Sequence, residues 1–291
     1  MSSSRGSWEL PISEGELSRL TSEMDEAHRA ALPVMAASAR DLSTELKDLG
    51  ACGSEPAHEE GSRLARRRFL AGAGASAAML ALAACGGKSS TTPTGGSVSG
   101  SPSAGASASS SASASASASG GSSTYTGDLK AVALSVALEN QAVAAYQAAL
   151  KAANAGKLGK VPPAIATFIQ TAMAQHKDHA DAWNGVLTSA GKPKITDVPL
   201  SDQAAVTKAL GQVKDVTGVA KLALQLEDQA TETYVFATYN VKSLGGVNTA
   251  ATIAPVEAMH AAILHYVLGQ YPVPDAFIGT KKAASPSLLT V

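Results

Sequence analysis

The chain has 291 residues, a formal net charge of −1 at pH 7 and an aromatic content of 4%. A charge balance this close to neutral gives no basic surplus for binding a polyanion, so nucleic acid is not among the expected partners. The arginines are unevenly placed, because all eight lie at or before Arg68. This change in composition indicates that the chain has two parts with different roles.

The first part, residues 1–64, is an extended N-region whose role the sequence leaves open. Its pattern over about residues 13–48 predicts an amphipathic helix. A cytosolic region that is later removed would explain such a segment, and so would a start codon assigned too early.

Residues 65–85 have the organisation of an export signal. Arg66, Arg67 and Arg68 precede an apolar run over 69–84, which ends in the tetrapeptide Leu-Ala-Ala-Cys at 82–85. The run has 16 residues, whereas a helix that spans a bilayer needs about 20. Its length and its small side chains are typical of the core of a signal peptide. The segment resembles a twin-arginine signal joined to the lipobox of bacterial lipoproteins.

This resemblance implies that Cys85 is lipidated and becomes the first residue of the mature chain. The implied partners are the twin-arginine export machinery and, through the lipid, the membrane. The implied location is the extracytoplasmic side of the cell membrane. The only other cysteine, Cys52, would be removed, so the mature chain would have no disulfide. The alternative is that Cys85 is an ordinary small residue in a core.

A segment rich in Ser, Ala, Gly and Thr follows over 86–125. It has almost no apolar surface to bury, so we expect a disordered linker there. The remaining residues, 126–291, are numerous enough to form one domain with a sizeable core.

The domain shows four long helical patterns, each ended by glycine or proline. A shorter pattern covers 202–211, inside a link of 25 residues (191–215) between the second and third long helices. A link of that length can cross a bundle, whereas the short links within each pair predict antiparallel hairpins. The expected fold class is all-α, a four-helix bundle with a long crossover, with long helices at about 127–155, 163–191, 216–245 and 249–269.

Each long helix places ionisable side chains on its apolar face, where burial of an unpaired charge is costly. Residues 86–291 contain only four glutamates and four histidines, and three of each lie on these faces. The segments LENQAVAAY (138–146) and LEDQATETY (226–234) also echo each other, with Glu and Tyr seven positions apart. The echo predicts a pseudo-twofold arrangement of potential metal ligands, drawn from Glu139, His176, His179, Glu227, Glu257 and His260.

These residues resemble the ligand pattern of the ferritin-like superfamily, in which two helices supply one glutamate each and two supply a Glu-x-x-His pair. Glu139 and Glu227 match the single glutamates, and Glu257 with His260 matches one pair, within a resemblance that covers 127–270. The other pair departs, because His176 stands where a glutamate is expected before His179. The resemblance implies a dinuclear iron or manganese centre, and the donor set also suits zinc.

The resemblance also implies that Tyr146 and Tyr234 hydrogen-bond to ligand carboxylates. Ordinary core packing is the alternative for both tyrosines and for His176. The implied function is that of an exported, membrane-anchored protein whose metal centre oxidises Fe(II) or handles peroxide. Two other functions stay open: metal binding or buffering without turnover, and a metal-free structural bundle of the cell envelope with a buried Glu–His hydrogen-bond network. A homodimer is also open, and the sequence assigns no catalytic residue.

Overall fold

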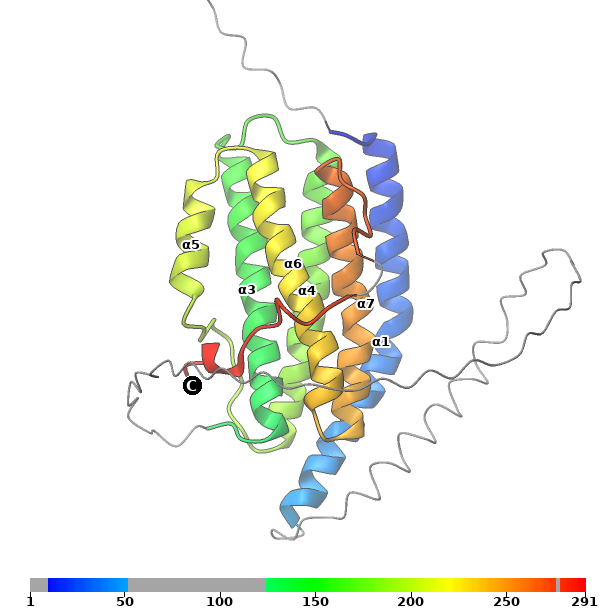
Figure 1. Cartoon of the computed structure of the whole chain (residues 1–291), viewed down its shortest axis with the longest axis vertical. Helices are drawn as coiled ribbons and strands as arrows, with labels where there is room; N and C mark the ends of the chain where they lie inside the picture. The colour runs from blue at the N-terminus through cyan, green and yellow to red at the C-terminus, as the bar shows by residue number, and fades with distance from the viewer. Residues whose placement is uncertain (1–9, 52–123, 276–277) are drawn as a thin grey trace, which may run out of the picture. The chain divides into compact units, whose positions relative to one another are not determined.

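The computed structural model describes residues 10–51, 124–275 and 278–291. Within these ranges the regular secondary structure consists of six α-helices and one short 3-10 helix, Pro286–Leu288, without a strand. The expected all-α fold class is therefore confirmed (Figure 1).

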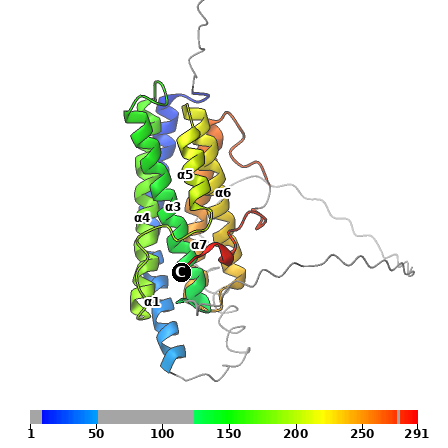
Figure 2. The ribbon, with the colours of Figure 1, turned by 90° about the vertical axis from the view of Figure 1, so that its left-hand side faces the viewer.

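Four long helices form the expected bundle. They are α3, Asp128–Asn154, α4, Pro163–Ser189, α6, Val216–Asn240, and α7, Leu244–Val267. The α3–α4 and α6–α7 pairs are the two hairpins, and each pair packs along its length. The link between the hairpins carries a short helix, α5, Gln203–Gln212, beside α3 and α6 (Figures 1 and 2). A proline in the first turn of α4 and the positive φ of Gly191 (+69°) after its end follow the usual rules for helix termini.

Helix α1, Glu14–Ala51, is the amphipathic helix expected over 13–48. It packs along α4 and α7, on the side of the bundle away from α5 (Figures 1 and 2). The residues buried in this contact lie at helical spacing, and the apolar ones among them are Leu17, Met24, Met35, Ala39 and Leu42. A segment that the sequence places in a separate N-region is thus packed against the bundle.

The boundary between α6 and α7 differs from the expectation. The sequence predicts a helix end at the Gly245-Gly246 pair, but α6 ends at Asn240 and both glycines lie in the first turn of α7. The reason is packing between helices, because a Cβ atom on Gly245 would lie 2.2 Å from the backbone nitrogen of Leu42 in α1. Two backbones approach each other so closely that only glycine fits between them.

The apolar core has two main parts, separated along each bundle helix by polar residues. One part contains Phe168, Ile165 and Leu264, and the other contains Trp183 and Ile253. The polar residues between them are the glutamates and histidines that the sequence marks as potential ligands. The bundle therefore holds its ionisable side chains in a layer with apolar packing at both ends.

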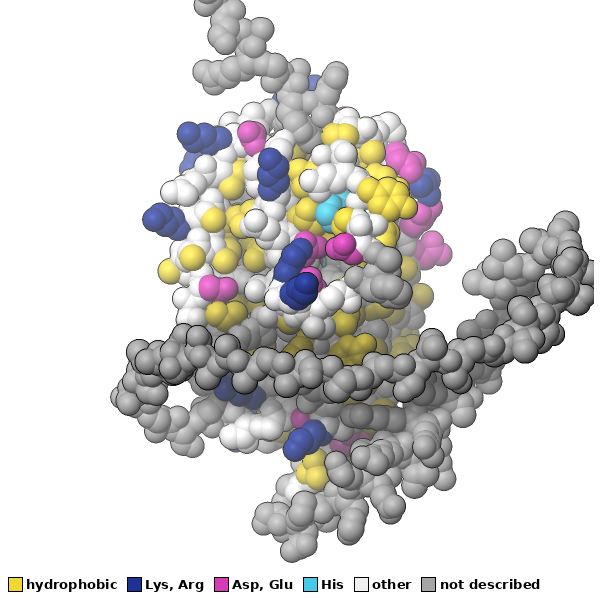
Figure 3. Space-filling model, viewed as in Figure 1, with side chains coloured by type: hydrophobic (Ala, Val, Ile, Leu, Met, Phe, Trp, Pro, Cys, Tyr) yellow, Lys and Arg dark blue, Asp and Glu magenta, His cyan; other side chains and the backbone are white. Residues whose placement is uncertain are grey.

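The C-terminal segment crosses the outside of α6 and reaches α3. The Lys282 ammonium lies 2.7 Å from the Asp228 carboxylate of α6, and the backbone N–H of Lys282 donates to Glu232. Figure 3 shows acidic and basic side chains next to each other in the middle of this face. The backbone N–H of the buried Ala284 donates to Thr233 Oγ1 over 2.8 Å, which fixes the segment to α6.

The proposed signal at 65–85, with Arg66, Arg67 and Cys85, lies outside the described residues, as does the linker up to residue 123. Tyr125, at the end of the expected linker, is buried in the core, and its hydroxyl donates to the Pro193 carbonyl over 2.9 Å. Among the helices in the described ranges, none combines the length and the hydropathy needed to cross a membrane.

Candidate metal centre

Six ionisable side chains from all four bundle helices meet in the middle of the bundle, and each has an exposed fraction of 2% or less. They form two groups, in each of which the potential ligand atoms lie within 4.8 Å of one another. Glu257 and His176 belong to both groups. The first group adds Glu139 and His179, and the second adds Glu227 and His260. Every potential ligand expected from the sequence is thus placed in one buried cluster.

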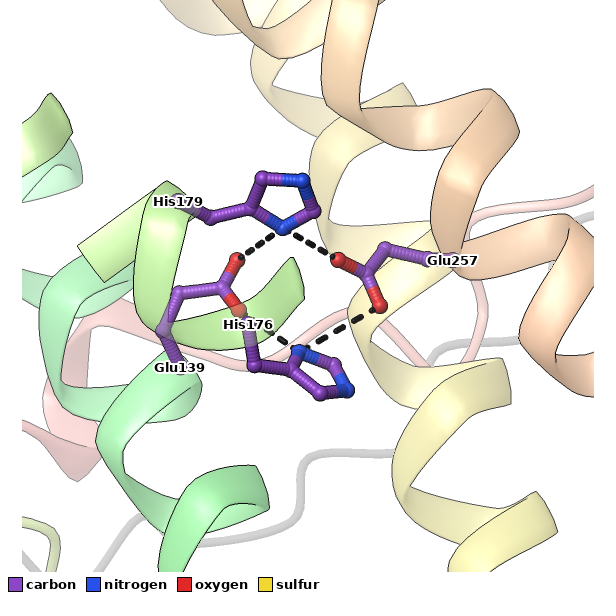
Figure 4. A group of neighbouring side chains, drawn as sticks. All are labelled: Glu139, His176, His179 and Glu257. Carbon is purple, nitrogen blue, oxygen red and sulfur yellow. Dashed lines mark hydrogen bonds and ion pairs between the residues drawn. The ribbon is translucent and has the colours of Figure 1, made fainter. Parts of the chain in front are cut away.

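Figure 4 shows the first group, in which Glu139 of α3 and Glu257 of α7 approach two imidazoles of α4 from opposite sides. His179 Nδ1 lies 3.0 Å from Glu257 Oε1 and 3.5 Å from Glu139 Oε1. His176 Nδ1 lies 2.7 Å from Glu139 Oε2 and 3.6 Å from Glu257 Oε2. Two carboxylates and two imidazole nitrogens therefore face one small volume.

In the second group, His260 Nδ1 lies 3.2 Å from Glu227 Oε2 and 3.3 Å from Glu257 Oε2. His176 also reaches this group, because its other ring nitrogen, Nε2, lies 3.2 Å from Glu227 Oε1. The single ring of His176 thus presents one nitrogen to each group. A glutamate at this position would present its two oxygens in a similar way, but with a negative charge.

Several buried polar atoms of the cluster lack a hydrogen bond. His179 Nδ1 and Nε2 and Glu257 Oε1 have no partner of normal hydrogen-bond geometry, although His179 Nδ1 and Glu257 Oε1 are only 3.0 Å apart. Buried polar atoms are rarely left unpaired in native proteins, and a bound ion can satisfy those that have no hydrogen bond. A mixed carboxylate and imidazole donor set suits Fe, Mn and Zn. The residues present therefore fit a dinuclear metal site.

The pKa values in the cluster indicate that a bound cation would replace protons on the imidazoles. Burial by itself would raise the pKa of Glu139, but the neighbouring His179 and His176 outweigh burial and lower that pKa to about 2. Burial by itself would lower the pKa of His179, but the Glu139 carboxylate outweighs it and raises the pKa of His179 to about 9. Without a metal, protons on the imidazoles compensate the carboxylates, and a bound cation would compete with those protons.

The two tyrosines of the sequence echo hydrogen-bond to ligand-type carboxylates, but crosswise. The Tyr146 hydroxyl of α3 donates to Glu227 Oε1 of α6, and the Tyr234 hydroxyl of α6 donates to Glu139 Oε1 of α3. Trp183 Nε1 donates to the Tyr234 oxygen over 3.1 Å. Each tyrosine therefore orients the glutamate of the other hairpin, which ties the two hairpins together at the cluster.

Three further residues near the cluster, Gln175, Asp25 and His28, were not predicted from the sequence. His260 Nε2 lies 2.8 Å from Gln175 Oε1, and Gln175 Nε2 donates to Asp25 Oδ1 of α1 over 3.4 Å. The ring of His28, also in α1, contacts the ring of His179 edge-on, with 5.2 Å between the centroids. A histidine on the apolar face of the expected helix 13–48 was a signal that could have found His28.

The free space beside the cluster is small. A cavity lined by Glu139, His176 and Gln141 has a volume of about 10 Å³, and a second one at Tyr146 and Glu227 has the same volume. Such a volume accommodates about one water molecule. Each of these two cavities therefore admits only a molecule of a few atoms.

The fold and the cluster define a class of protein: a helical bundle with a buried carboxylate–imidazole site that can hold two metal ions. Residues 125–270, about half of the chain, match the family model described as Ferritin-like domain, and the chain belongs to this family. No curated protein and no solved structure matches the chain significantly.

Proposed function

We propose that the protein is an exported, membrane-anchored ferritin-like protein that binds a dinuclear iron or manganese centre and oxidises Fe(II) or handles peroxide. The observation that carries the proposal is the pair of buried ligand groups that share Glu257 and His176. Burial of three carboxylates is costly unless charges of opposite sign offset them, and two divalent ions would do so.

In this proposal Glu139 and His179 would hold one metal and Glu227 and His260 the other, and Glu257, which belongs to both groups, could serve either. His176 can serve either group, because each of its nitrogens faces a different one. When bound, the metal pair supplies one-electron redox chemistry. The chain fixes the ligands: Nε2 of His260 donates to Gln175 Oε1, which leaves the Nδ1 lone pair directed at the site.

The size of the free space narrows the class of substrate. Cavities of about 10 Å³ at Glu139 and Glu227 admit a metal ion or a molecule of a few atoms. Fe(II), dioxygen and peroxide satisfy this limit. The proposed reactions are therefore those whose reactants are smallest.

The cell-surface part of the proposal rests on the sequence of residues 65–85. The arginines 66–68, the apolar run after them and the Leu-Ala-Ala-Cys tetrapeptide support export with a lipid on Cys85. The bundle would then stand on the extracytoplasmic side of the membrane, joined to the lipid by the segment 86–125.

Two other functions have an observation in their favour. Non-catalytic metal binding fits the closed site, whose neighbouring cavities hold about one water molecule each. A metal-free structural bundle fits the position of His176, which can donate to Glu139 over 2.7 Å and to Glu227 over 3.2 Å and so compensate charge with protons.

Anaerobic loading of the purified full chain with Fe(II), followed by exposure to air, separates the three functions. The proposal predicts two irons per chain, a new near-ultraviolet absorption on oxidation and repeated turnover of added Fe(II). Two tightly held irons without turnover would favour buffering. A chain that takes up no iron or manganese, and is equally stable with and without them, would favour the metal-free structural bundle.

A further inference from the structure

Helix α1 precedes the proposed export signal, yet it makes specific contacts with the bundle that follows the signal. Leu17 and Met24 pack in one part of the core, and Met35 and Leu42 pack in the other. Ser38 accepts a hydrogen bond from the buried Thr249 of α7 over 2.9 Å. Thus α1 covers the α4–α7 face over most of its own length.

Acidic residues near the two ends of α1 meet the N-termini of the helices that α1 covers. Glu14 Oε2 accepts from the Ala164 N–H at the start of α4 over 3.4 Å, and Glu45 Oε1 accepts from the Gly245 N–H at the start of α7 over 3.0 Å. Neither α4 nor α7 has a side-chain cap from its own N-cap residue. A carboxylate at a helix N-terminus is favourable, because it pairs with a free N–H and with the helix dipole. These contacts fix the direction and register of α1.

Between its ends, α1 contacts the surroundings of two histidines of the cluster: it reaches His260 through Gln175, and it touches the ring of His179 directly. Asp25 accepts from Gln175, which in turn accepts from His260. His28, with an exposed fraction of 3%, lies against His179, and the Nε2 atoms of both rings have no hydrogen-bond partner. A histidine that binds metal through Nδ1 needs an acceptor for the proton on Nε2. Gln175 fills that role for His260, and His28 is the group next to His179 that can fill it there.

The order of the chain gives these contacts a consequence. Residues 14–51 lie before Arg66 and Cys85, and the bundle lies after them. Cleavage ahead of Cys85 would cut the covalent link to α1, and transfer of the bundle alone across a membrane would separate α1 from the α4–α7 face. The contacts between α1 and the bundle can exist only before such a transfer.

We propose that α1 is a detachable part of the metal centre, which positions His179 through His28 and His260 through Asp25 and Gln175, and which leaves with the export signal. The inference rests on the proposed function. The precursor would hold its metals under a closed face, and the processed protein would hold the same metals with His179 and His260 less constrained and nearer to solvent. Export would thus bring the two histidines of the metal centre nearer to solvent.

The test uses the full chain, kept unprocessed by Arg66→Lys and Arg67→Lys, and loaded with Co(II), whose absorption reports its ligands. The measured quantity is the rate at which EDTA removes each of the two metals. His28→Leu and Asp25→Ala should each speed the loss of one metal by about tenfold or more, the effect expected when an outer hydrogen-bond partner of a ligand is lost. Asp41→Ala, at an exposed position of α1, is the matched control and should leave both rates unchanged.

Two conservative variants separate hydrogen bonding from packing. His28→Gln and Asp25→Asn keep an acceptor oxygen, so they should restore slow release and the parent Co(II) spectrum. If they release metal as fast as His28→Leu and Asp25→Ala, the two residues act by packing and the positioning role is wrong. Unchanged release in His28→Leu and Asp25→Ala would also overturn the proposal.

Detachment is tested in the same loaded chain with a protease site inserted in the segment 86–125. After cleavage and removal of the α1 fragment, the bundle should keep its helical circular dichroism and lose metal to EDTA about tenfold faster or more. A bundle that unfolds without α1, or one that releases metal at the old rate, would contradict the proposal. A parent chain that binds no Co(II) refutes the proposed function, whereas a parent that binds it and is insensitive to α1 refutes only this inference.

Discussion

Raising the pH should destabilise the metal-free protein, and the size of the effect follows from the ion pairs of the cluster. Burial by itself would lower the pKa of His179, but the Glu139 carboxylate raises it to about 9, against an ordinary value of 6.5. A pKa that is raised on folding adds stability that is complete below the unfolded value and is lost as the pH rises through the folded value. The window for this loss is therefore pH 6.5 to about 9.

The difference between the unfolded and folded pKa values of His179 corresponds to a loss of about 3 kcal/mol in the free energy of unfolding. The pKa values of His176 and His260 shift in the same direction, because nearby glutamates outweigh the effect of burial and raise them.

Urea unfolding of the metal-free full chain at pH 6 and at pH 9.5 measures the loss of stability. His179→Gln should remove the share of the loss that belongs to His179, about 3 kcal/mol, whereas His265→Gln, outside the cluster, should remove none. With metal bound, the imidazoles are already deprotonated, so the loss should disappear. Equal stability at both pH values in the metal-free protein would refute protonated imidazoles as the compensating charges.

Three further predictions concern single residues. His176→Glu should tighten the binding of the weaker of the two metals, and His176→Ala should lose that metal while sparing the other. Competition with a chelator measures both affinities. If both variants bind two metals as tightly as the parent, His176 is a packing residue. Tyr234→Phe should lower the free energy of unfolding by about 1–3 kcal/mol, because Glu139 and Trp183 each lose a buried partner, whereas Tyr239→Phe, 75% exposed, should leave it unchanged in the same denaturant titration. Cys85→Ser should remove the protein from membrane fractions or leave the precursor uncleaved, and a variant that matures and fractionates like the parent would exclude the lipid.

The bundle helices could be predicted from the sequence because their signals are local. Apolar spacing identifies the buried face, and glycine and proline mark the ends, so α3, α4 and α5 lie within two residues of their expected bounds. The same local reasoning failed at Gly245, where glycine is needed for the approach of Leu42, far away in the chain. A contact of that kind leaves no trace in the neighbouring sequence.

The cluster could be predicted from the sequence for a different reason, which is the scarcity of its residue types. Glutamate and histidine are rare after residue 86, so their places on apolar faces stood out. Which partner each side chain finds depends on the packing of the helices, and the crossed bonds of Tyr146 to Glu227 and Tyr234 to Glu139 were therefore not predictable. The same is true of His28, whose neighbour His179 lies in a helix on the far side of the proposed signal and linker.

The measurement that tests the central claim most directly is the equilibrium binding of Mn(II) to the full chain, with Glu257→Gln for comparison. Glu257 belongs to both ligand groups and is fully buried, so its carboxylate should be needed by both metals. The parent chain should bind two Mn(II) ions, and Glu257→Gln should weaken both of them, whereas Glu232→Gln, outside the cluster on α6, should bind as the parent does. A parent chain that binds neither Mn(II) nor Fe(II), or a Glu257→Gln chain that binds two Mn(II) ions as tightly as the parent, would contradict a dinuclear centre at this cluster.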